Sequence, residues 1–214
     1  MKYRFTNRTG GASSGAFASL NLGTHVFDDL PTVLSNRALL VEEVGPIQYM
    51  SQVHGNRVVV IEEVTDEDPT ADALVTGIPG VSLAVQVADC IPLLLHSSQS
   101  VAAVHVGRKG LMNQVALKAV SLMKQLGAVQ INGVVGPHIC GECYEVDSQT
   151  YADVRSTYPA TGEKNNYLNL YKGLEEQLGD IKLENLNLCT KENSRFFSHR
   201  ANAEAGRQVG VISL

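Results

Sequence analysis

Two histidines and a cysteine are the residues of this sequence whose side chains best suit a metal ion. His54, Cys90 and His105 offer imidazole and thiolate ligands, and both types suit a borderline-soft ion such as Zn²⁺. Three protein ligands leave a fourth position for water or substrate, which is the arrangement of catalytic zinc. The three residues lie far apart and form no short ligand pair such as His-x-x-x-His. Their spacing therefore leaves a second interpretation open, a buried thiol and two hydrogen-bonded histidines.

Two adjacent cations provide a second chemical feature close to the last of these histidines. Arg108 and Lys109 stand between Gly107 and Gly110, just before a helix predicted from about residue 111. Free backbone N–H groups and the dipole at a helix start attract anions such as phosphate. This segment therefore indicates an anion site, and a solvated loop is the alternative interpretation.

The remaining cysteines and histidines give weaker signals. Cys140 and Cys143 form a single CxxC motif, which is typical of redox chemistry or of half a zinc knuckle. No second CxxC pair accompanies it, so the sequence favours two unpaired thiols. The other four histidines are predicted to make local hydrogen bonds; they are His25, His96, His138 and His199.

Composition places the chain among ordinary globular proteins. Of its 214 residues 44% are hydrophobic and 18% are charged, so one domain spanning residues 1–214 is expected. A net charge of -5 argues against a general nucleic-acid-binding surface, which needs clustered Lys and Arg. The sequence shows no signal-peptide core and no apolar run of membrane-spanning length. We therefore expect a cytoplasmic protein with no membrane or nucleic-acid partner.

Hydrophobic periodicity predicts helices and strands that alternate along the chain. Apolar residues recur at helical spacing in segments 31–44, 111–126 and 170–178. Short apolar or β-branched runs predict strands, which are 57–64, 81–87, 91–95, 101–106, 131–135, 183–188 and 208–212. No repeat or linker separates these elements, so periodicity indicates one mixed α/β unit.

The segments around the three candidate ligands resemble the hallmark motifs of a known family. Gln52-Val53-His54-Gly55, Ala88-Asp89-Cys90-Ile91-Pro92 and Ala103-Val104-His105-Val106-Gly107 are similar to QVHG, ADCxP and AVHAGWRG of the YfiH-type laccase-domain family. Further matching segments follow in the family's order across nearly the whole chain; they include 19–23, 35–37, 72–76, 136–139, 144–146, 189–190 and 196–207. One departure is the Arg108-Lys109 pair, which stands where the family has Trp-Arg, and the chain contains no tryptophan.

The resemblance implies a fold, a cofactor and an activity. The implied fold is α/β (α+β), a single domain in which a mixed β-sandwich is flanked by helices, as in YfiH and the catalytic domain of cytotoxic necrotizing factors. Zn²⁺ held by His54, Cys90 and His105 is the implied cofactor, with copper as a less favoured ion. Phosphorolysis of adenosine, inosine and methylthioadenosine, with adenosine deamination as a second activity, is the implied chemistry. Nucleoside and phosphate are thus the expected partners.

Six further residues are expected to bind substrate or phosphate. The family's Asn-Arg pair lies near its active site, which places Arg37 there, and Lys109 and Arg108 add cations. The remaining candidates, which also have structural interpretations, occupy matching motifs; they are Asn21, Gln52 and Arg200. Lys109 lacks the planar, bidentate geometry of arginine, so substrate orientation is expected to differ from that in the family.

Three other functions remain open at this stage. A copper polyphenol oxidase of the laccase type needs many histidine ligands, and the chain has six histidines in all. A cysteine hydrolase would use Cys90 as nucleophile and His105 as base, on a substrate such as a peptidoglycan precursor. A binding module without enzymatic activity is the third alternative. Metal content and nucleoside turnover distinguish these functions.

Overall fold

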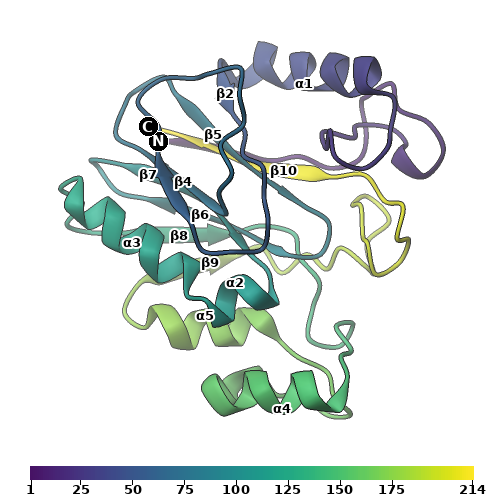
Figure 1. The fold of residues 1–214 in the computed structure, drawn as a ribbon, viewed down its shortest axis with the longest axis vertical. Helices are drawn as coiled ribbons and strands as arrows, with labels where there is room; N and C mark the ends of the chain where they lie inside the picture. The colour runs from purple at the N-terminus through teal and green to yellow at the C-terminus, as the bar shows by residue number, and fades with distance from the viewer.

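Two β-sheets pack face to face at the centre of the molecule, and helices cover both outer faces (Figure 1). The computed structural model describes all residues from 1 to 214. Helix α1 (Leu30–Val44) covers the smaller sheet. The larger sheet is covered by three helices, which are α2 (Arg108–Met112), α3 (Val115–Gln125) and α5 (Leu170–Leu178). Helix α4 (Ser148–Thr157) lies farther from the sheet, packs against the 3-10 turn Pro159–Thr161 and adds Val154 to the same apolar cluster (Figure 1). The expected α/β sandwich is thereby confirmed.

Both sheets mix parallel and antiparallel pairs. The smaller has the order β1 (Lys2–Phe5), β10 (Gln208–Ser213), β5 (Ser82–Val87) and β2 (Ile47–Gln48). The larger has the order β3 (Val58–Val60), β4 (Ala73–Thr76), β7 (Val101–Val106), β6 (Ile91–His96), β8 (Asn132–Val135) and β9 (Lys182–Asn185). In the smaller sheet β1 pairs with β10 antiparallel, with Lys2 opposite Ser213.

Side chains that alternate in direction along the central strands contribute to two apolar layers, one between the two sheets and one between the larger sheet and the helices. Successive side chains of a strand point to opposite faces. In β6, Leu94 therefore packs between the two sheets, whereas Leu93 and Leu95 pack beneath the helices. The strand has apolar residues on both faces because both faces are buried. His105 lies in β7 between Val104 and Val106, which face the helices, so its imidazole points to the other face.

The helices begin and end where local chemistry favours it. The side chain of Asp29 accepts a hydrogen bond from Thr32 N (3.0 Å), and Pro31 occupies the first turn of α1. Gly45, with φ of 81°, ends that helix in a conformation that favours glycine. Asp147 and Asn169 cap α4 and α5 in the same way as Asp29.

The structure differs from the sequence-based elements at several places. The helix predicted over 111–126 divides into α2 and α3 at Gln114, whose φ of 60° interrupts a right-handed helix. Arg108 and Lys109 consequently lie within α2 rather than before a helix. The strand predicted over 57–64 ends at Val60, because the charged pair Glu62-Glu63 is exposed in a bend. Strands β1, β2 and β4 and helix α4 were not predicted.

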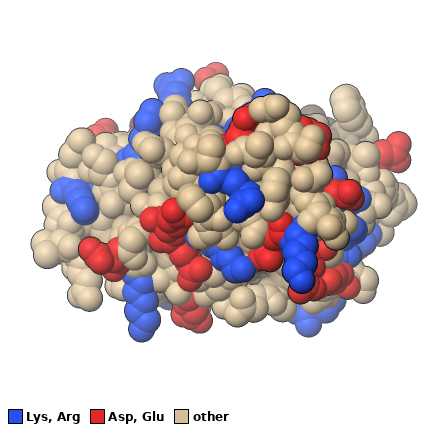
Figure 2. Space-filling model, turned by 90° about the horizontal axis from the view of Figure 1, so that it is seen from below, with Lys and Arg blue, Asp and Glu red and all other residues tan.

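The surface beneath the helical layer carries both signs of charge. On the face seen in Figure 2, Lys and Arg side chains are interspersed with Asp and Glu. None of the helices has both the length and the apolar character needed to cross a membrane.

Candidate metal centre and active-site cleft

The side chains of His54, Cys90 and His105 meet at the end of a cleft. One ligand atom from each lies within 4.8 Å of the others, and Cys90 Sγ is 3.9 Å from His54 Nε2. Cys90 directly precedes β6 and His105 lies in the neighbouring antiparallel strand β7, opposite Pro92. His54 comes from the loop before β3. An imidazole, a thiolate and a second imidazole are a donor set that fits Zn²⁺, and this gathering is the one that the motifs predict.

A single buried carboxylate positions both histidines. Asp72 is fully buried, and its Oδ1 lies 2.9 Å from His105 Nδ1. The same carboxylate accepts backbone N–H bonds from Val53 (3.3 Å), His54 (2.9 Å) and Gly55 (2.7 Å). These bonds hold the loop in which His54 adopts a φ of 57°. Because Nδ1 of His105 is bonded to Asp72, its Nε2 is free for a metal, as in carboxylate–histidine–zinc groups.

Cys90 and His105 stabilise each other as an ion pair. Burial opposes the ionisation of both groups, but their attraction is stronger. The pKa of Cys90 is lowered from 9.0 to about 6 by His105 and, to a smaller extent, by His54. The pKa of His105 is raised from 6.5 to about 9 by Cys90 and by the hydrogen bond to Asp72. The thiolate is the form of cysteine that binds metals and acts as a nucleophile.

Gly107 provides the space in which the three ligands meet. A Cβ atom at this position would lie 2.9 Å from Cys90 Sγ and 3.3 Å from His54 Cδ2. The turn from β7 into α2 therefore needs glycine so that the thiol and the imidazole can approach one another.

A cleft of about 480 Å³ opens above these ligands and carries positive charge on its wall. Arg207 is half-buried there, and of its guanidinium nitrogens only Nη1 donates to the protein, to the carbonyls of Ala205 (2.6 Å) and Gly206 (3.1 Å). Arg200 is exposed, with its guanidinium 5.3 Å from the ring centre of Tyr144. The full lining is His25, Gln52, His54, Gln86, Val87, Ala88, Asp89, Cys90, His105, Tyr144, His199, Arg200 and Arg207.

Two other residues in the lining are kept uncharged. Burial, followed by repulsion from Arg207 and Arg37, lowers the pKa of His25 to about 4. Burial raises the pKa of Tyr144, although Arg108 opposes that effect. A neutral imidazole and a protonated phenol are therefore available for hydrogen bonds to a ligand.

Asp89 contributes to the wall as a structural group. It has a φ of 92°, so the chain does not pass from Asp89 to Cys90 as a regular strand. Its carboxylate accepts hydrogen bonds from Thr190 Oγ1 and from Arg200 N, both at 2.6 Å. These two contacts attach the segment 190–200 beside Cys90.

Gln52 and Asn21 use their amides within the protein. Gln52 donates to Gln86 O (2.8 Å) and accepts from Gln86 N (2.7 Å), as a strand residue would. Asn21 is fully buried, accepts from Gly23 N and Arg207 N, and donates to Asp28. Asn21 thus holds the backbone of Arg207, and any contact of these two amides with substrate stays a prediction.

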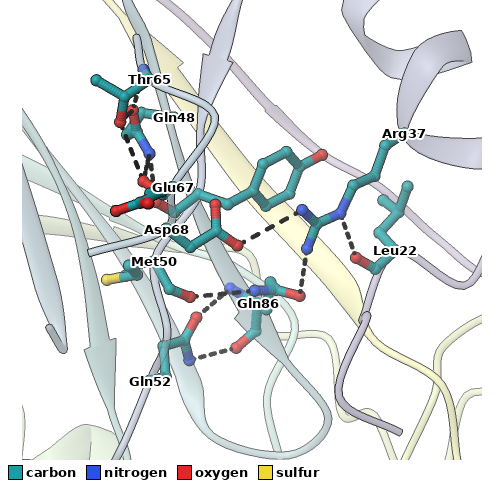
Figure 3. A network of polar contacts seen from close by, with 10 residues as sticks. Leu22, Arg37, Gln48, Met50, Gln52, Thr65, Glu67, Asp68 and Gln86 are labelled. Carbon is teal, nitrogen blue, oxygen red and sulfur yellow. Dashed lines mark hydrogen bonds and ion pairs between the residues drawn. The ribbon is translucent and has the colours of Figure 1, made fainter. Parts of the chain in front are cut away.

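Arg37 is held by protein groups behind the cleft rather than in its lining (Figure 3). Figure 3 shows its guanidinium pointing toward Asp68, Gln86 and the carbonyl of Leu22. Nε donates to Leu22 O at 2.9 Å, Nη1 lies 3.6 Å from the Asp68 carboxylate, and the guanidinium stacks 3.7 Å from the ring centre of Tyr49. Its phosphate-binding role stays a prediction that these contacts do not favour.

The cations of α2 also lie outside the cleft lining. Lys109 is exposed, and Arg108 is partly buried beside Tyr144. Of the expected substrate-binding residues, Gln52 and Arg200 therefore reach the cleft. Sequence reasoning missed the roles of Asp72 and Arg207, although both stand in segments that match the family, and it read His25 only as a local hydrogen-bonder.

Comparison with known proteins places the whole chain in one family. A model described as "Multi-copper polyphenol oxidoreductase laccase" matches residues 2–214. A purine nucleoside phosphorylase of Corynebacterium glutamicum is 37% identical over 228 residues, which cover 98% of this chain and 93% of that protein. One of Streptomyces coelicolor is also 37% identical, over 99% of this chain and 95% of that protein.

Solved structures of similar proteins have the same fold. A Neisseria meningitidis protein of the DUF152 family has a TM-score of 0.90 and 31% identity, over 99% of this chain and 93% of that one. The YfiH protein of Bacillus licheniformis has a TM-score of 0.86 and 28% identity, over 98% and 91%. Motifs, fold and comparisons agree that the chain belongs to the YfiH-type, multi-copper polyphenol oxidoreductase laccase family.

Proposed function

We propose that this protein is a zinc-dependent purine nucleoside phosphorylase that acts on adenosine, inosine and methylthioadenosine and also deaminates adenosine. The observation that carries the proposal is the placement of three metal-ligating side chains and two arginines around one cleft. The name of the relatives, purine nucleoside phosphorylase, supports the phosphorylase activity. Deamination, the nucleosides, the identity of the metal and the cytoplasmic location are parts of the proposal.

The metal site fits a catalytic zinc ion. His54, Cys90 and His105 would hold the ion, and Asp72 would orient His105 from behind. When bound, zinc with three protein ligands supplies a Lewis acid with one position open to a ligand. The protein's own contribution is to keep Cys90 deprotonated and to hold His105 Nε2 toward the shared centre.

Phosphorolysis also requires an anion beside the sugar. A phosphate oxygen forms a bond to the anomeric carbon, the carbon–nitrogen bond to the purine breaks, and the base leaves with that electron pair and takes up a proton. Arg207 is the best-placed cation, because its Nε and Nη2 donate to no protein group and its backbone is fixed by Asn21. Arg200 supplies a second cation at the rim.

Turnover assays of the zinc-loaded protein test this assignment. We expect phosphate-dependent release of hypoxanthine from inosine, and Arg207→Met should raise the KM for phosphate by about tenfold or more, as the loss of a charge-assisted contact does. Deamination of adenosine takes water as its nucleophile, so it should change much less. The KM for phosphate of Lys109→Ala and of Arg37→Met, measured in the same assay, tests the phosphate-binding roles that the sequence predicts for Lys109 and Arg37. Equal loss of both activities in Arg207→Met would contradict a phosphate-binding role.

A cysteine hydrolase is a second candidate that one observation favours. His105 lies between Cys90 and Asp72, so the three side chains follow the order of a nucleophile, a base and an orienting carboxylate. The same carboxylate contact is typical of zinc-bound histidines, and His54 has no role in such a triad. Hydrolysis that persists after zinc removal and is abolished by alkylation of Cys90 would favour the hydrolase; activity that returns only with zinc favours the phosphorylase.

The family description raises copper oxidation as a third candidate. His54, Cys90 and His105 form one small ligand group, whereas a laccase needs several copper ions held largely by histidines. We expect copper-loaded protein to show no laccase-like turnover of polyphenols. An oxygen-consumption assay with each metal in turn measures this directly.

A further inference from the structure

A second group of side chains that could bind a metal lies outside the cleft described above. The proposed reaction uses none of them. Cys140, Cys143, Cys189 and Glu192 each place one ligand atom within 4.8 Å of the others. All three cysteines are free thiols. Cys140, Cys189 and Glu192 line a separate cleft of about 540 Å³, whose lining shares no residue with that of the His54, Cys90 and His105 cleft, and Cys143 is buried. A metal ion therefore has its own route to this group.

The topology of the larger sheet brings these residues together. Strands β8 and β9 are parallel neighbours at one edge, so the segments that follow them leave the sheet at the same end. Two backbone bonds continue this pairing, from His138 N to Leu188 O and from Thr190 N to His138 O, each at 3.0 Å. Cys189 thus lies beside the start of the 140–143 turn although it is far away in sequence.

The turn itself has a fixed conformation. Cys140 O accepts hydrogen bonds from the backbone N–H groups of Cys143 and Tyr144, both at 3.1 Å. Gly141 lies against the residue that caps α5, since a Cβ atom there would be 2.8 Å from Asn169 Cβ. Both cysteines of the CxxC motif are consequently presented on one side of a tight turn.

The donor set is that of a closed, thiolate-rich site. Three sulfurs and one carboxylate oxygen match the four-coordinate, tetrahedral preference of Zn²⁺. Cys189 Sγ already accepts a backbone N–H bond from Cys140 at 3.4 Å, and Cys143 Sγ lies 3.5 Å from Glu192 Oε1. The first is an outer contact of the kind that orients metal ligands in known sites, and the second brings two of the candidate ligands together. We propose that Cys140, Cys143, Cys189 and Glu192 form a second, structural site for a thiophilic divalent cation such as Zn²⁺.

This second site would support the wall of the first. Cys143 is followed by Tyr144, which lines the active-site cleft, and Cys189 is followed by Thr190, which bonds to Asp89 beside Cys90. An ion bound here links the two loops that carry these residues. It therefore holds the cleft wall in place without contacting substrate.

Metal counting with single-site variants tests the proposal. The full-length protein, stripped with a chelator and kept reduced, is loaded with Zn²⁺ and its bound metal is measured by mass spectrometry after gel filtration. We expect two ions per chain in wild type, one in Cys90→Ser, one in Cys189→Ser, and none in the double variant. Cys90→Ser is the matched control, because it also removes one thiol but leaves the second site complete.

Cadmium distinguishes the two sites by the number of sulfurs. The ultraviolet charge-transfer absorbance of bound Cd²⁺ grows with the number of thiolate ligands, so the ion left in Cys90→Ser should absorb about three times as strongly as the ion left in Cys189→Ser. If Cys189→Ser does not fold, Glu192→Gln serves in its place. It should weaken Zn²⁺ binding at this site by about tenfold or more, with Glu184→Gln on β9 as its control.

Two results would overturn the second site. The first is that reduced wild-type protein binds only one ion per chain and that Cys90→Ser binds none. This result would leave the proposed function intact. The other is a Cd²⁺ absorbance of Cys90→Ser no greater than that of Cys189→Ser. A Cys90→Ser variant that loses only the ion of the first site and still turns over nucleosides as wild type does would refute the proposed function. The proposal of the second site would then still stand.

Discussion

At the scale of single residues, the candidate metal centre depends on Asp72 as well as on its three candidate ligands. One carboxylate fixes the ring of His105 and three successive amides of the His54 loop. Removing its charge would free the imidazole to rotate and would leave amides without their acceptor. Asp72 is not a candidate ligand itself, but its contacts orient His54 and His105 toward the same centre.

We predict that Asp72→Asn weakens Zn²⁺ binding at the His54, Cys90 and His105 site by about 10- to 100-fold, because outer-shell partners of zinc-bound histidine contribute on that scale. Competition with a chromogenic chelator measures the dissociation constant. Asp68→Asn, which removes a partly exposed carboxylate near Arg37, is the control and should bind zinc as wild type does. Unchanged affinity in Asp72→Asn would show that the loop holds its shape without the charge.

His25 is expected to respond to a phosphate bound in the cleft, as the proposed function requires. Its pKa of about 4 reflects burial first and then the positive charges of Arg207 and Arg37. A phosphate bound beside Arg207 offsets that repulsion and stabilises the imidazolium, so the pKa of His25 should rise when phosphate binds. NMR titration of the His25 ring with and without phosphate measures the shift. In Arg207→Met the starting pKa should be higher and the response to phosphate smaller; an identical response would place the anion elsewhere.

At the scale of elements, the turn between β7 and α2 leaves the space in which the candidate ligands approach one another. Gly107 leaves room that a methyl group would take from Cys90 Sγ. The turn also starts a short helix, which carries the Arg108-Lys109 pair away from the cleft lining. This segment thus has the family's glycine at position 107, where the ligands need room, although Arg108-Lys109 stands in place of the family's Trp-Arg.

Gly107→Ala is therefore expected to reduce Zn²⁺ affinity while the fold is retained, because the new Cβ displaces the thiol by several tenths of an ångström. Metal content after equilibrium dialysis measures the affinity, and urea unfolding of the metal-free protein measures stability. Zinc affinity equal to that of wild type would mean that the turn can shift to accept the methyl group.

The sequence predicted the elements that have their own local signal. Helices α1 and α5 and the central strands β5, β6 and β7 follow from periodicity, and the three metal ligands follow from short motifs. The break at Gln114 and the short strand β4 depend on packing, which periodicity does not contain. Asp72, Arg207 and the approach of Cys189 to Cys140 depend on contacts between distant segments. A single sequence gives no separate signal for such contacts.

At the scale of the whole molecule, stability rests on the interface between the two sheets. Leu94 of β6 is fully buried there among residues of β4, β5, β7 and β10. Because side chains from both sheets meet in this layer, a cavity in it weakens both. The candidate active-site cleft takes residues from both sheets and the loops between them, so its geometry depends on this layer.

Leu94→Ala should lower the free energy of unfolding by about 2 to 5 kcal/mol, the range for large-to-small changes in a packed core. Val129→Ala, at a side chain that is 88% exposed, should leave it nearly unchanged. Urea denaturation followed by circular dichroism compares the two. A loss below 1 kcal/mol for Leu94→Ala would mean that the layer between the sheets relaxes to fill the cavity.

The pairing of β1 with β10 affects the order in which parts of the fold can form during synthesis. Lys2 lies opposite Ser213, and the two chain ends lie side by side (Figure 1). During synthesis β1 is made long before its partner strand β10. The smaller sheet therefore cannot close until β10 has been made, and Arg207, which directly precedes β10, is made only shortly before it. The three candidate metal ligands are made much earlier, so the proposed anion site gains its main cation only after all the ligands of the proposed metal site have been made.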